Sequence, residues 1–277
     1  MKEAVWLPLF DDLADPGVVA DLAARAEAAK WDGFFVWDHI RWGEADRRIG
    51  DAWVTLAAVA RSTSSIRLGP MVIPLPRYRP ASLARQTVSL DLLSKGRLIL
   101  GAGLGNDRFG GEYSRFGESP DSRRHAAIAD EIRSILPAAW TGNAVHHAGE
   151  HHTIDDVRFL PTPYQHPAIP IWIAGTATAA APRRRAALHD GFFPVNVRNA
   201  SDFADIILAQ NNSPSFDFAA TVRIQDDAND YRDAGATWIL REIQPEIGLP
   251  AISTLIDEGP RTKGFPEPKG PPSSQLI

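Results

Sequence analysis

The stretch IRLGPMVIPLPRYRPASLARQTVSLDLLSKGRLILGAG, residues 66–103, decides the fold. Short apolar runs at 66–73 and 97–101 predict β-strands, and the segment 80–93 between them starts with a proline and predicts a helix. Strands joined by a helix of this length pair in parallel, because a long crossover is needed to bring the second strand back beside the first. This stretch therefore reads as a β/α/β unit.

The same alternation continues in both directions along the chain. Aspartates 15 and 51 precede two of the expected helices and are candidate N-caps. The predicted strands are 5–9, 33–37, 66–73, 97–101, 169–174, 191–195, 216–222 and 237–240. The predicted helices are 16–30, 52–62, 80–93, 121–140, 179–188, 201–210, 226–233 and 250–257.

About eight such units in 277 residues predict an α/β fold of the (β/α)8 TIM-barrel type. A doubly wound open sheet is the main alternative, but it would not need so many evenly repeated units. Two long segments interrupt the pattern as insertion loops, 106–120 after the fourth strand and 141–170 before the fifth, and loops of this length tend to be functional. We expect one barrel domain over 1–259 and a poorly ordered tail over 260–277, which is rich in Pro, Gly and Ser.

Composition excludes several classes of protein. The chain has no Cys, so disulfides, Cys-held metal centres and thiolate nucleophiles are ruled out. A net charge of -5 disfavours nucleic acid as a partner. The sequence contains no run of about 18 apolar residues, which a membrane span would require. The N-terminus runs directly into a predicted strand rather than a signal peptide. We therefore expect a cytoplasmic protein that acts on a small molecule.

Barrel chemistry belongs at the carboxyl ends of the strands, and His39 follows the second one. An imidazole exchanges a proton near neutral pH, so His39 is the candidate catalytic acid or base. Asp38 beside it could orient the ring or neutralise its charge. The alternative is a strand-end histidine that only caps backbone groups.

Two glycine-containing segments at other strand ends predict close approach of the backbone to a planar ligand. Gly69-Pro70 predicts a bulge, because proline cannot donate to the sheet, and Pro70 could itself be cis. The Gly101–Gly105 segment has the spacing G-x-G-x-G and lacks the helix that a dinucleotide fingerprint requires.

The loop 175–178 precedes a helix and could hold an anion. The arginines at 183–185 that follow it could either complete a phosphate cradle or form an exposed basic face.

Four histidines lie close together in the second insertion, at 146, 147, 151 and 152. A metal site is one interpretation. We favour a surface hairpin with a turn at 148–150, because adjacent side chains on a strand point to opposite faces and the H-E-x-x-H spacing is missing. No metal is expected.

Several motifs, in this order and spacing, resemble the bacterial luciferase-like superfamily, most of all its branch that uses coenzyme F420 or a flavin. The resemblance spans about residues 1–260, and the motifs are Trp37-Asp38-His39, Asp51-Ala52-Trp53, residues 66–72, residues 96–105, residues 161–175 and residues 234–238.

This resemblance implies a barrel that holds an isoalloxazine or deazaflavin ring at the strand ends, with His39 at its reacting face. Met71 and Val72 fall where the family has a bulge, often with a non-prolyl cis peptide, behind the ring. The implied cofactor-binding residues are Asp38, Pro70, Met71, Val72, Gly105, Asn106, Ala174, Gly175, Thr176 and Ala177.

The implied activity is hydride transfer between an organic substrate and coenzyme F420. An FMN-dependent monooxygenase is the first alternative, and a non-catalytic ligand-binding barrel is the second. Trp42, Phe109, Tyr113 and Phe116 suggest an apolar or aromatic substrate pocket, although loop aromatics could also form a subunit contact. A homodimer is implied by the family.

Overall fold

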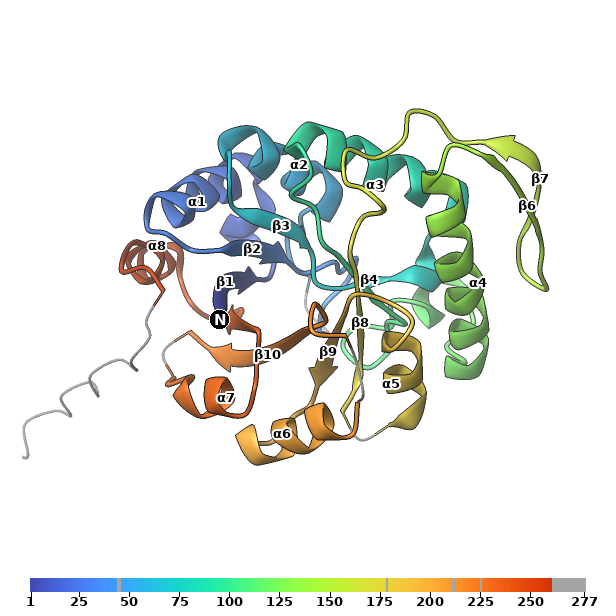
Figure 1. Cartoon of the computed structure of the whole chain (residues 1–277). Coiled ribbons are helices and arrows are strands. Elements are labelled where there is room, and N and C mark those ends of the chain that lie inside the picture. The colour runs from blue at the N-terminus through green and yellow to red at the C-terminus, as the bar shows by residue number, and fades with distance from the viewer. Residues whose placement is uncertain (44–45, 178, 211–212, 225, 261–277) are drawn as a thin grey trace, which may run out of the picture.

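The strands form a ring surrounded by helices in the computed structural model, which describes residues 1–43, 46–177, 179–210, 213–224 and 226–260 (Figure 1). The predicted tail lies outside these residues from 261 onward. The strands of the ring are β1 (Lys2–Leu7), β2 (Gly33–Val36), β3 (Arg67–Pro70), β4 (Ile73–Pro74), β5 (Leu100–Gly103), β8 (Ile171–Thr176), β9 (Gly191–Val195), β10 (Asp217–Arg223) and β11 (Trp238–Glu242).

The sheet is a nearly closed parallel barrel with the order β3-β2-β1-β11-β10-β9-β8-β5-β4. β3 and β4 stand at the two ends of this order, but they are consecutive in the chain and together form the third of the eight strand positions of the barrel. The first and last strands of the sheet are therefore neighbours. The Leu68 N–H donates to Arg97 O (3.1 Å), and the Ile99 N–H donates to Leu68 O (2.9 Å), which joins β3 to the β5 side. The TIM-barrel prediction is confirmed, and the open-sheet alternative is wrong.

The helices pack around this ring. Their starts follow the expected caps, because the Asp15 carboxylate accepts from Gly17 N (2.8 Å) and the Asp51 carboxylate from Val54 N (2.8 Å). The α-helices are α1 (Pro16–Ala28), α2 (Ala52–Ser62), α3 (Pro80–Ser94), α4 (Ser122–Trp140), α5 (Ala180–Ala186), α6 (Ala200–Leu208), α7 (Asn229–Asp233) and α8 (Leu249–Asp257). The 3-10 turns are η1 (Asp11–Ala14), η2 (Leu75–Arg77) and η3 (Ser114–Phe116). None of these helices is both long and apolar enough to cross a bilayer.

Two apolar cores follow from the alternation of side chains along each strand. The larger core lies between strands and helices and includes Val5, Leu7 and Leu56. The smaller one fills the inside of the barrel, and its members are Ala4, Phe35, Met71, Ile99, Trp172, Phe193, Ala219, Trp238 and Leu240. The barrel is therefore packed solid below its carboxyl rim.

The fourth strand starts later than predicted. The expected strand 97–101 is displaced to 100–103, with Leu98 contributing only an isolated bridge to Leu68. Arg97 explains the difference, because its buried guanidinium donates to carbonyl oxygens of Ala60 (2.8 Å) and Ile66 (3.0 Å). The apolar pattern predicts a strand here, but this side chain ties the residue to the carboxyl end of α2 instead.

The third strand is broken after Pro70 rather than running through to residue 73. The Met71-Val72 peptide bond is cis, whereas Gly69-Pro70 is not among the cis bonds of the described chain. Two glycines allow the crowded crossing beside the break. A Cβ on Gly69 would overlap the carbonyl oxygen of Ile99, and one on Gly101 would lie 2.6 Å from Pro70 O.

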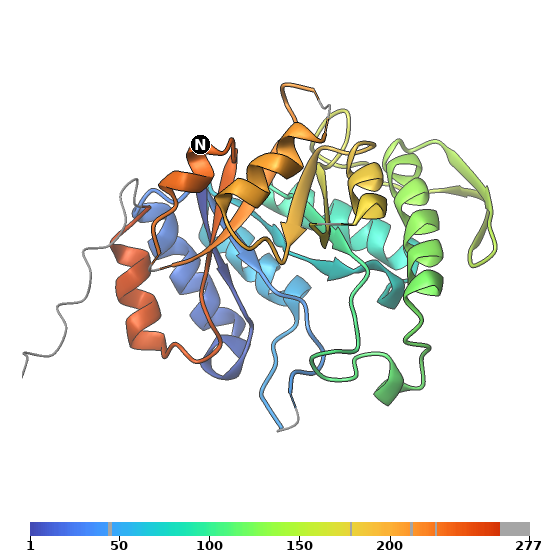
Figure 2. The ribbon, with the colours of Figure 1, turned by 90° about the horizontal axis from the view of Figure 1, so that it is seen from below.

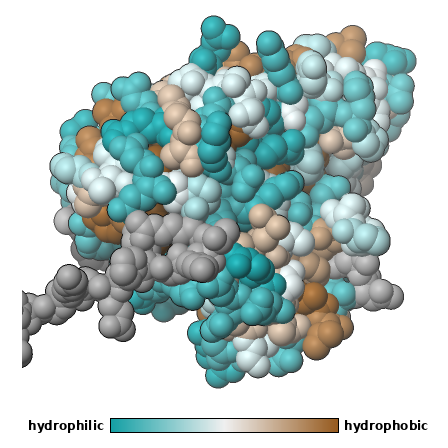
Figure 3. All heavy atoms as spheres, turned by 60° about the vertical axis from the view of Figure 1, so that its left-hand side comes forward, coloured by the Kyte–Doolittle hydropathy of each residue, from teal (hydrophilic) through white to brown (hydrophobic). Residues whose placement is uncertain are grey.

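The two insertions lie in different parts of the molecule. The later one forms the antiparallel hairpin of β6 (Ala144–Ala148) and β7 (Thr153–Arg158), which projects from the body beside α4 (Figure 1). The earlier one joins β5 to α4 and holds only η3. Figure 2 shows it running beside the loop that follows β2, at the same end of the barrel. The face around α8 and α1 is largely hydrophilic, with scattered apolar residues (Figure 3).

Candidate functional site

A cavity of about 860 Å³ opens at the carboxyl ends of the strands. Its floor is apolar and is formed by the uppermost inward side chains of the barrel, Trp6, Met71, Val72, Phe193 and Val195. The Trp6 indole N–H donates to Met71 O (2.6 Å), so β1 holds the broken third strand in place from inside the barrel. The floor offers a broad apolar surface with few polar groups of its own.

His39 lies on the wall of this cavity, where Glu112 holds its ring. Its Nδ1 is 3.1 Å from Glu112 Oε2, and the Ile40 N–H donates to Glu112 Oε1 (2.8 Å). Since a carboxylate can only accept here, the contact favours the tautomer with the proton on Nδ1. Among the described residues Nε2 has no hydrogen-bond partner, so that nitrogen remains available to a ligand.

Arg77 joins two carboxylates behind His39. It contacts Glu112 Oε1 (3.1 Å) and Asp38 Oδ2 (2.8 Å), and the Tyr78 hydroxyl donates to the same Asp38 oxygen (2.7 Å). The Asp38 carboxylate therefore binds Tyr78 and Arg77 rather than the imidazole, so of the two roles considered for it, orienting the ring by a hydrogen bond does not hold. Successive side chains diverge at the strand end, and the orienting role passes to Glu112.

The two carboxylates respond differently to this environment. Burial raises the pKa of Asp38 above its ordinary value despite the opposing influence of Arg77 and Tyr78. Burial also opposes the charge of Glu112, but His39, Arg77 and the Ile40 N–H outweigh it and lower the pKa of Glu112. The lowered pKa of Glu112 favours its ionised form beside the imidazole.

Aromatic rings enclose the other sides of His39. The Trp42 ring centroid is 4.7 Å from His39 and 4.7 Å from Phe109, with which it stacks at an interplanar angle of 14°. The Gly43 N–H also donates to Phe109 O, so the loops after β2 and β5 are joined over the site. Trp42 and Phe109 line the cavity as predicted, whereas Tyr113 is buried beneath it and Phe116 is exposed.

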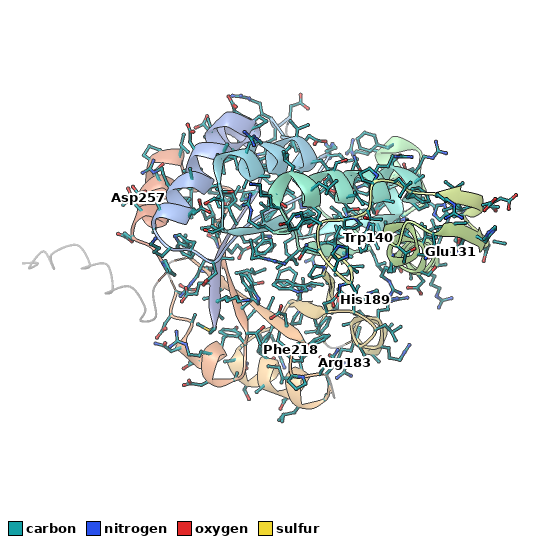
Figure 4. The ribbon with its side chains drawn as sticks, turned by 45° about the horizontal axis from the view of Figure 1, so that its top comes forward. Glu131, Trp140, Arg183, His189, Phe218 and Asp257 are labelled. Carbon is teal, nitrogen blue, oxygen red and sulfur yellow. The ribbon has the colours of Figure 1, made fainter. Side chains whose placement is uncertain are left out.

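The opposite wall is cationic. Arg133 of α4 and Arg185 of α5 both line the cavity and both contact Asp130, so two guanidinium groups share one carboxylate. Arg133 also lies 2.8 Å from His189 Nε2, and burial together with this cation lowers the pKa of His189 to about 4. Figure 4 labels His189 between the sheet and these helices. This wall keeps a net positive charge that suits an anionic group.

Most residues predicted to touch a cofactor do line this one cavity. They are Asp38, Met71, Val72, Gly105, Asn106, Ala174, Gly175 and Thr176, together with His39. Pro70 and Ala177 are not among the lining residues. Pro70 pairs with Val36 in the wall of the barrel, and Ala177 is buried with its N–H donating to Val195 O (3.1 Å). Contact with a cofactor remains a prediction for the whole set.

The loop 175–178 differs from the expected anion site. Gly175 and Thr176 belong to β8 and pair with Pro194 and Val195, and Thr178 lies outside the described residues. The helix that follows, α5, has only seven residues and offers little dipole. Of the arginine run, Arg185 lines the cavity, and its side chain donates to Asp130.

The charged residues of the site that sequence reasoning missed include Arg77, Glu112, Arg133 and Glu242. Glu112 lies within an insertion loop that was predicted to be functional, but nothing local marks it as the partner of His39. Glu242 is the last residue of β11, the eighth strand position. Its place at the carboxyl end of a strand was the sequence signal that could have identified it.

The four clustered histidines lie on the β6–β7 hairpin, which confirms the predicted hairpin, although its turn spans 149–152 rather than 148–150. His147 Nε2 is 3.3 Å from Glu131 Oε2, and the backbone N–H groups of His151 and His152 donate to the same carboxylate. Figure 4 shows Glu131 on α4 beside the hairpin. No group of three potential metal ligands is found within the described part of the chain.

The fold and the cavity define a parallel (β/α)8 barrel with a ligand site at its carboxyl rim. A family model described as luciferase-like monooxygenase matches residues 10–222. The chain belongs to this luciferase-like family.

Curated relatives are similar over part of their length. The F420-dependent hydroxymycolic acid dehydrogenase of Mycobacterium tuberculosis is 33% identical over 165 residues, which is 58% of this chain and 45% of that protein. The F420-dependent glucose-6-phosphate dehydrogenase of Kineococcus radiotolerans is 32% identical over 161 residues, which is 57% of this chain and 47% of that protein. The chain thus spans about half the length of the curated relatives it matches.

Solved structures share the fold. A monooxygenase from Streptomyces bottropensis superposes with a TM-score of 0.73 at 18% identity, covering 92% of this chain and 96% of that one. An F420-dependent secondary alcohol dehydrogenase, in complex with an F420-acetone adduct, gives 0.72 at 15% identity, covering 94% and 99%. At these identities the likeness shows the architecture alone.

Proposed function

We propose that this protein is an oxidoreductase that moves a hydride between a small organic substrate and coenzyme F420 held at the carboxyl rim of the barrel. The observation that carries the proposal is the His39–Glu112 pair on the wall of an apolar-floored cavity, with His39 Nε2 available to a ligand. The F420-dependent relatives in the family support this choice of cofactor over FMN.

The cavity fits a flat ring that carries an anionic tail. Trp6, Met71 and Val72 offer an apolar surface for a ring, and Gly103 lets the backbone of β5 pack closely against Val72, since a Cβ there would lie 3.0 Å from Val72 Cγ2. The anionic part would lie against Arg133 and Arg185. Asn106, Ala174, Gly175 and Thr176 line the space between these regions and would complete the cradle.

A bound deazaflavin supplies a ring carbon that accepts a hydride and does not activate oxygen. The substrate we infer is an alcohol, whose carbon gives up the hydride with both bonding electrons while its oxygen loses a proton, which leaves a carbonyl group. His39 Nε2 accepts that proton, and the ionised Glu112 stabilises the resulting imidazolium. The stacked Trp42 and Phe109 shield the site from water.

Cofactor titration tests this proposal directly. The purified protein is titrated separately with F420 and with FMN while the fluorescence of each cofactor is followed. We expect tight quenching of F420 and weak quenching of FMN. The reverse pattern would favour the FMN-dependent monooxygenase, and no quenching of either would favour a non-catalytic ligand-binding barrel.

Replacement of His39 separates catalysis from binding. We expect His39→Ala to lower kcat by about a hundredfold or more, because general acid–base catalysis contributes on that order, while the Kd for F420 changes less than threefold. Single-turnover reduction of F420, followed by its absorbance, gives the rate. Unchanged turnover would remove His39 from the mechanism.

We further infer, from the family resemblance, a cytoplasmic homodimer built from one barrel domain over 1–259. Exposed apolar side chains such as Val54 on α2 and Leu92 on α3 are available to be buried in a subunit contact. Analytical ultracentrifugation is expected to give twice the monomer mass of 30.2 kDa.

A further inference from the structure

Glu242 is a carboxylate at the rim of the cavity that the proposed hydride transfer does not use. It ends β11, two residues after Leu240, whose side chain lies in the barrel interior, so the alternation of the strand also turns Glu242 inward. Its register neighbours are Trp6 on β1 and Arg223 on β10, and all three line the cavity. The side chain therefore faces the ligand space.

The carboxylate of Glu242 has no partner in the described part of the chain, where it accepts no hydrogen bond and forms no ion pair within 4 Å. Burial raises the pKa of Glu242, and the charge of Arg223 only partly opposes this. A half-buried carboxylate without a donor is costly, so an O–H or N–H group brought by a ligand would be favoured there.

Glu242 and His39 border the same compartment. Trp6 lies beside Glu242 in the register, its ring centroid is 5.2 Å from that of Trp37, and Trp37 is 5.9 Å from His39. Trp6 and Trp37 thus lie between the two polar groups. A substrate whose reacting hydroxyl meets His39 can present a second polar group to Glu242.

Charge divides the cavity into two poles. Arginines from α4, α5 and the loop after β9 line one side, namely Arg133, Arg185 and Arg198. Asp226, Asp227 and Glu242 line the other side, where Arg223 is the register neighbour of Glu242, while Asp38 and Glu112 on the His39 wall are paired with Arg77. An anionic cofactor tail matches the first pole, and the unpaired carboxylate of Glu242 would repel an anionic substrate group placed against it.

From this arrangement we propose that Glu242 determines substrate specificity: the substrate is an alcohol that carries a second hydroxyl or an amino group, bound by Glu242, and it carries no anionic group. The proposal rests on the proposed function and extends it to a substrate class. It sets this chain apart from relatives named for a phosphorylated sugar.

Four alcohols built on one six-membered ring test it: cyclohexanol, cyclohexane-1,4-diol, 4-aminocyclohexanol and 4-hydroxycyclohexanecarboxylate. F420 reduction is measured with each on the native protein. The diol and the amino alcohol are expected to show a KM at least tenfold below that of cyclohexanol, and the carboxylate a KM at least tenfold above it. Equal KM values, or a preference for the carboxylate, would overturn the proposal.

Two variants test whether the Glu242 carboxylate is the source of the substrate preference. Glu242→Gln keeps the shape and removes the charge, so the amino alcohol should lose most of its advantage over cyclohexanol. Glu246→Gln, a change at an exposed glutamate four residues along the same segment, should leave all four KM values as they are. If Glu242→Gln affects every alcohol to the same extent, Glu242 is structural and the proposal fails.

A cofactor-free measurement keeps this result separate from the proposed function. Calorimetry compares binding of 4-aminocyclohexanol with that of 4-hydroxycyclohexanecarboxylate to the unloaded protein and to Glu242→Gln. Tighter binding of the amino alcohol that is lost in the variant supports the role of Glu242 even if neither cofactor binds. Equal binding of the two ligands contradicts that role even if F420 binds tightly.

Discussion

At the scale of single residues, the site depends on a contact between distant parts of the chain. His39 follows the second strand and Glu112 lies 73 residues later in an insertion loop, yet the two meet at 3.1 Å. Glu112 is almost fully buried and also binds Arg77 and the Ile40 N–H. It touches neither the substrate nor a cofactor in the mechanism proposed above and acts through His39, so it is a positioning residue.

Glu112→Gln tests this role. The amide keeps the size of the side chain but cannot stabilise the imidazolium, so we expect kcat to fall by about tenfold or more while KM and the Kd for F420 change little. Steady-state kinetics and F420 quenching measure these quantities. Glu118→Gln, at an exposed position in the same loop, is the matched control. A loss confined to KM would show that Glu112 shapes the pocket instead.

At the scale of elements, the broken third strand and its neighbour form a crowded crossing in the wall of the barrel. The backbone of β3 meets the β5 side through the isolated bridge between Leu68 and Leu98, and the chain crosses there with no room for side chains at Gly69 or Gly101. The break carries Met71 and Val72 to the floor of the cavity, where Trp6 holds the Met71 carbonyl. Packing at this crossing thus positions the ring-binding surface.

Gly69→Ala should therefore destabilise the fold. A Cβ there would overlap the Ile99 carbonyl, and the backbone can only relieve the overlap by opening the barrel, at a cost of about 2–4 kcal/mol. Urea unfolding followed by tryptophan fluorescence measures the free energy of unfolding. Gly248→Ala is the control, because a Cβ at Gly248 meets nothing closer than 3.9 Å. Equal stability of the two variants would contradict the packing argument.

At the scale of the whole molecule, charged side chains connect the outer helices to the loops between strands. Glu27 of α1 accepts hydrogen bonds from the N–H groups of Ser64 (2.9 Å), Ser65 (2.6 Å) and Ile66 (2.9 Å), just before β3. Partial burial opposes its charge, but these donors outweigh it and hold the pKa of Glu27 at about 2, below its usual 4.5. The Arg97 guanidinium likewise connects the barrel to α2, because it donates to the carbonyl groups of Ala60 and Thr63 at the end of that helix.

Stability should consequently fall in acid. Since the folded pKa of Glu27 is depressed, its contribution is complete above about pH 4.5 and disappears as the pH falls toward 2. We expect native protein to lose about 1–2 kcal/mol more than Glu27→Gln over that interval, after allowance for the partial exposure of the side chain. Urea unfolding between pH 5 and pH 2.5 gives the difference. Parallel curves for the two proteins would contradict it.

Local patterns in the sequence determined the alternation of strands and helices, the caps at Asp15 and Asp51, the hairpin, and the place of His39 at the rim. Each of these depends on neighbours a few residues away, so it can be predicted without the fold. Only the tertiary structure decided that Arg97 delays the fourth strand, that Glu112 rather than Asp38 holds His39, and that Glu242 faces the ligand space. These outcomes depend on closing the barrel, which brings together side chains that no local pattern connects.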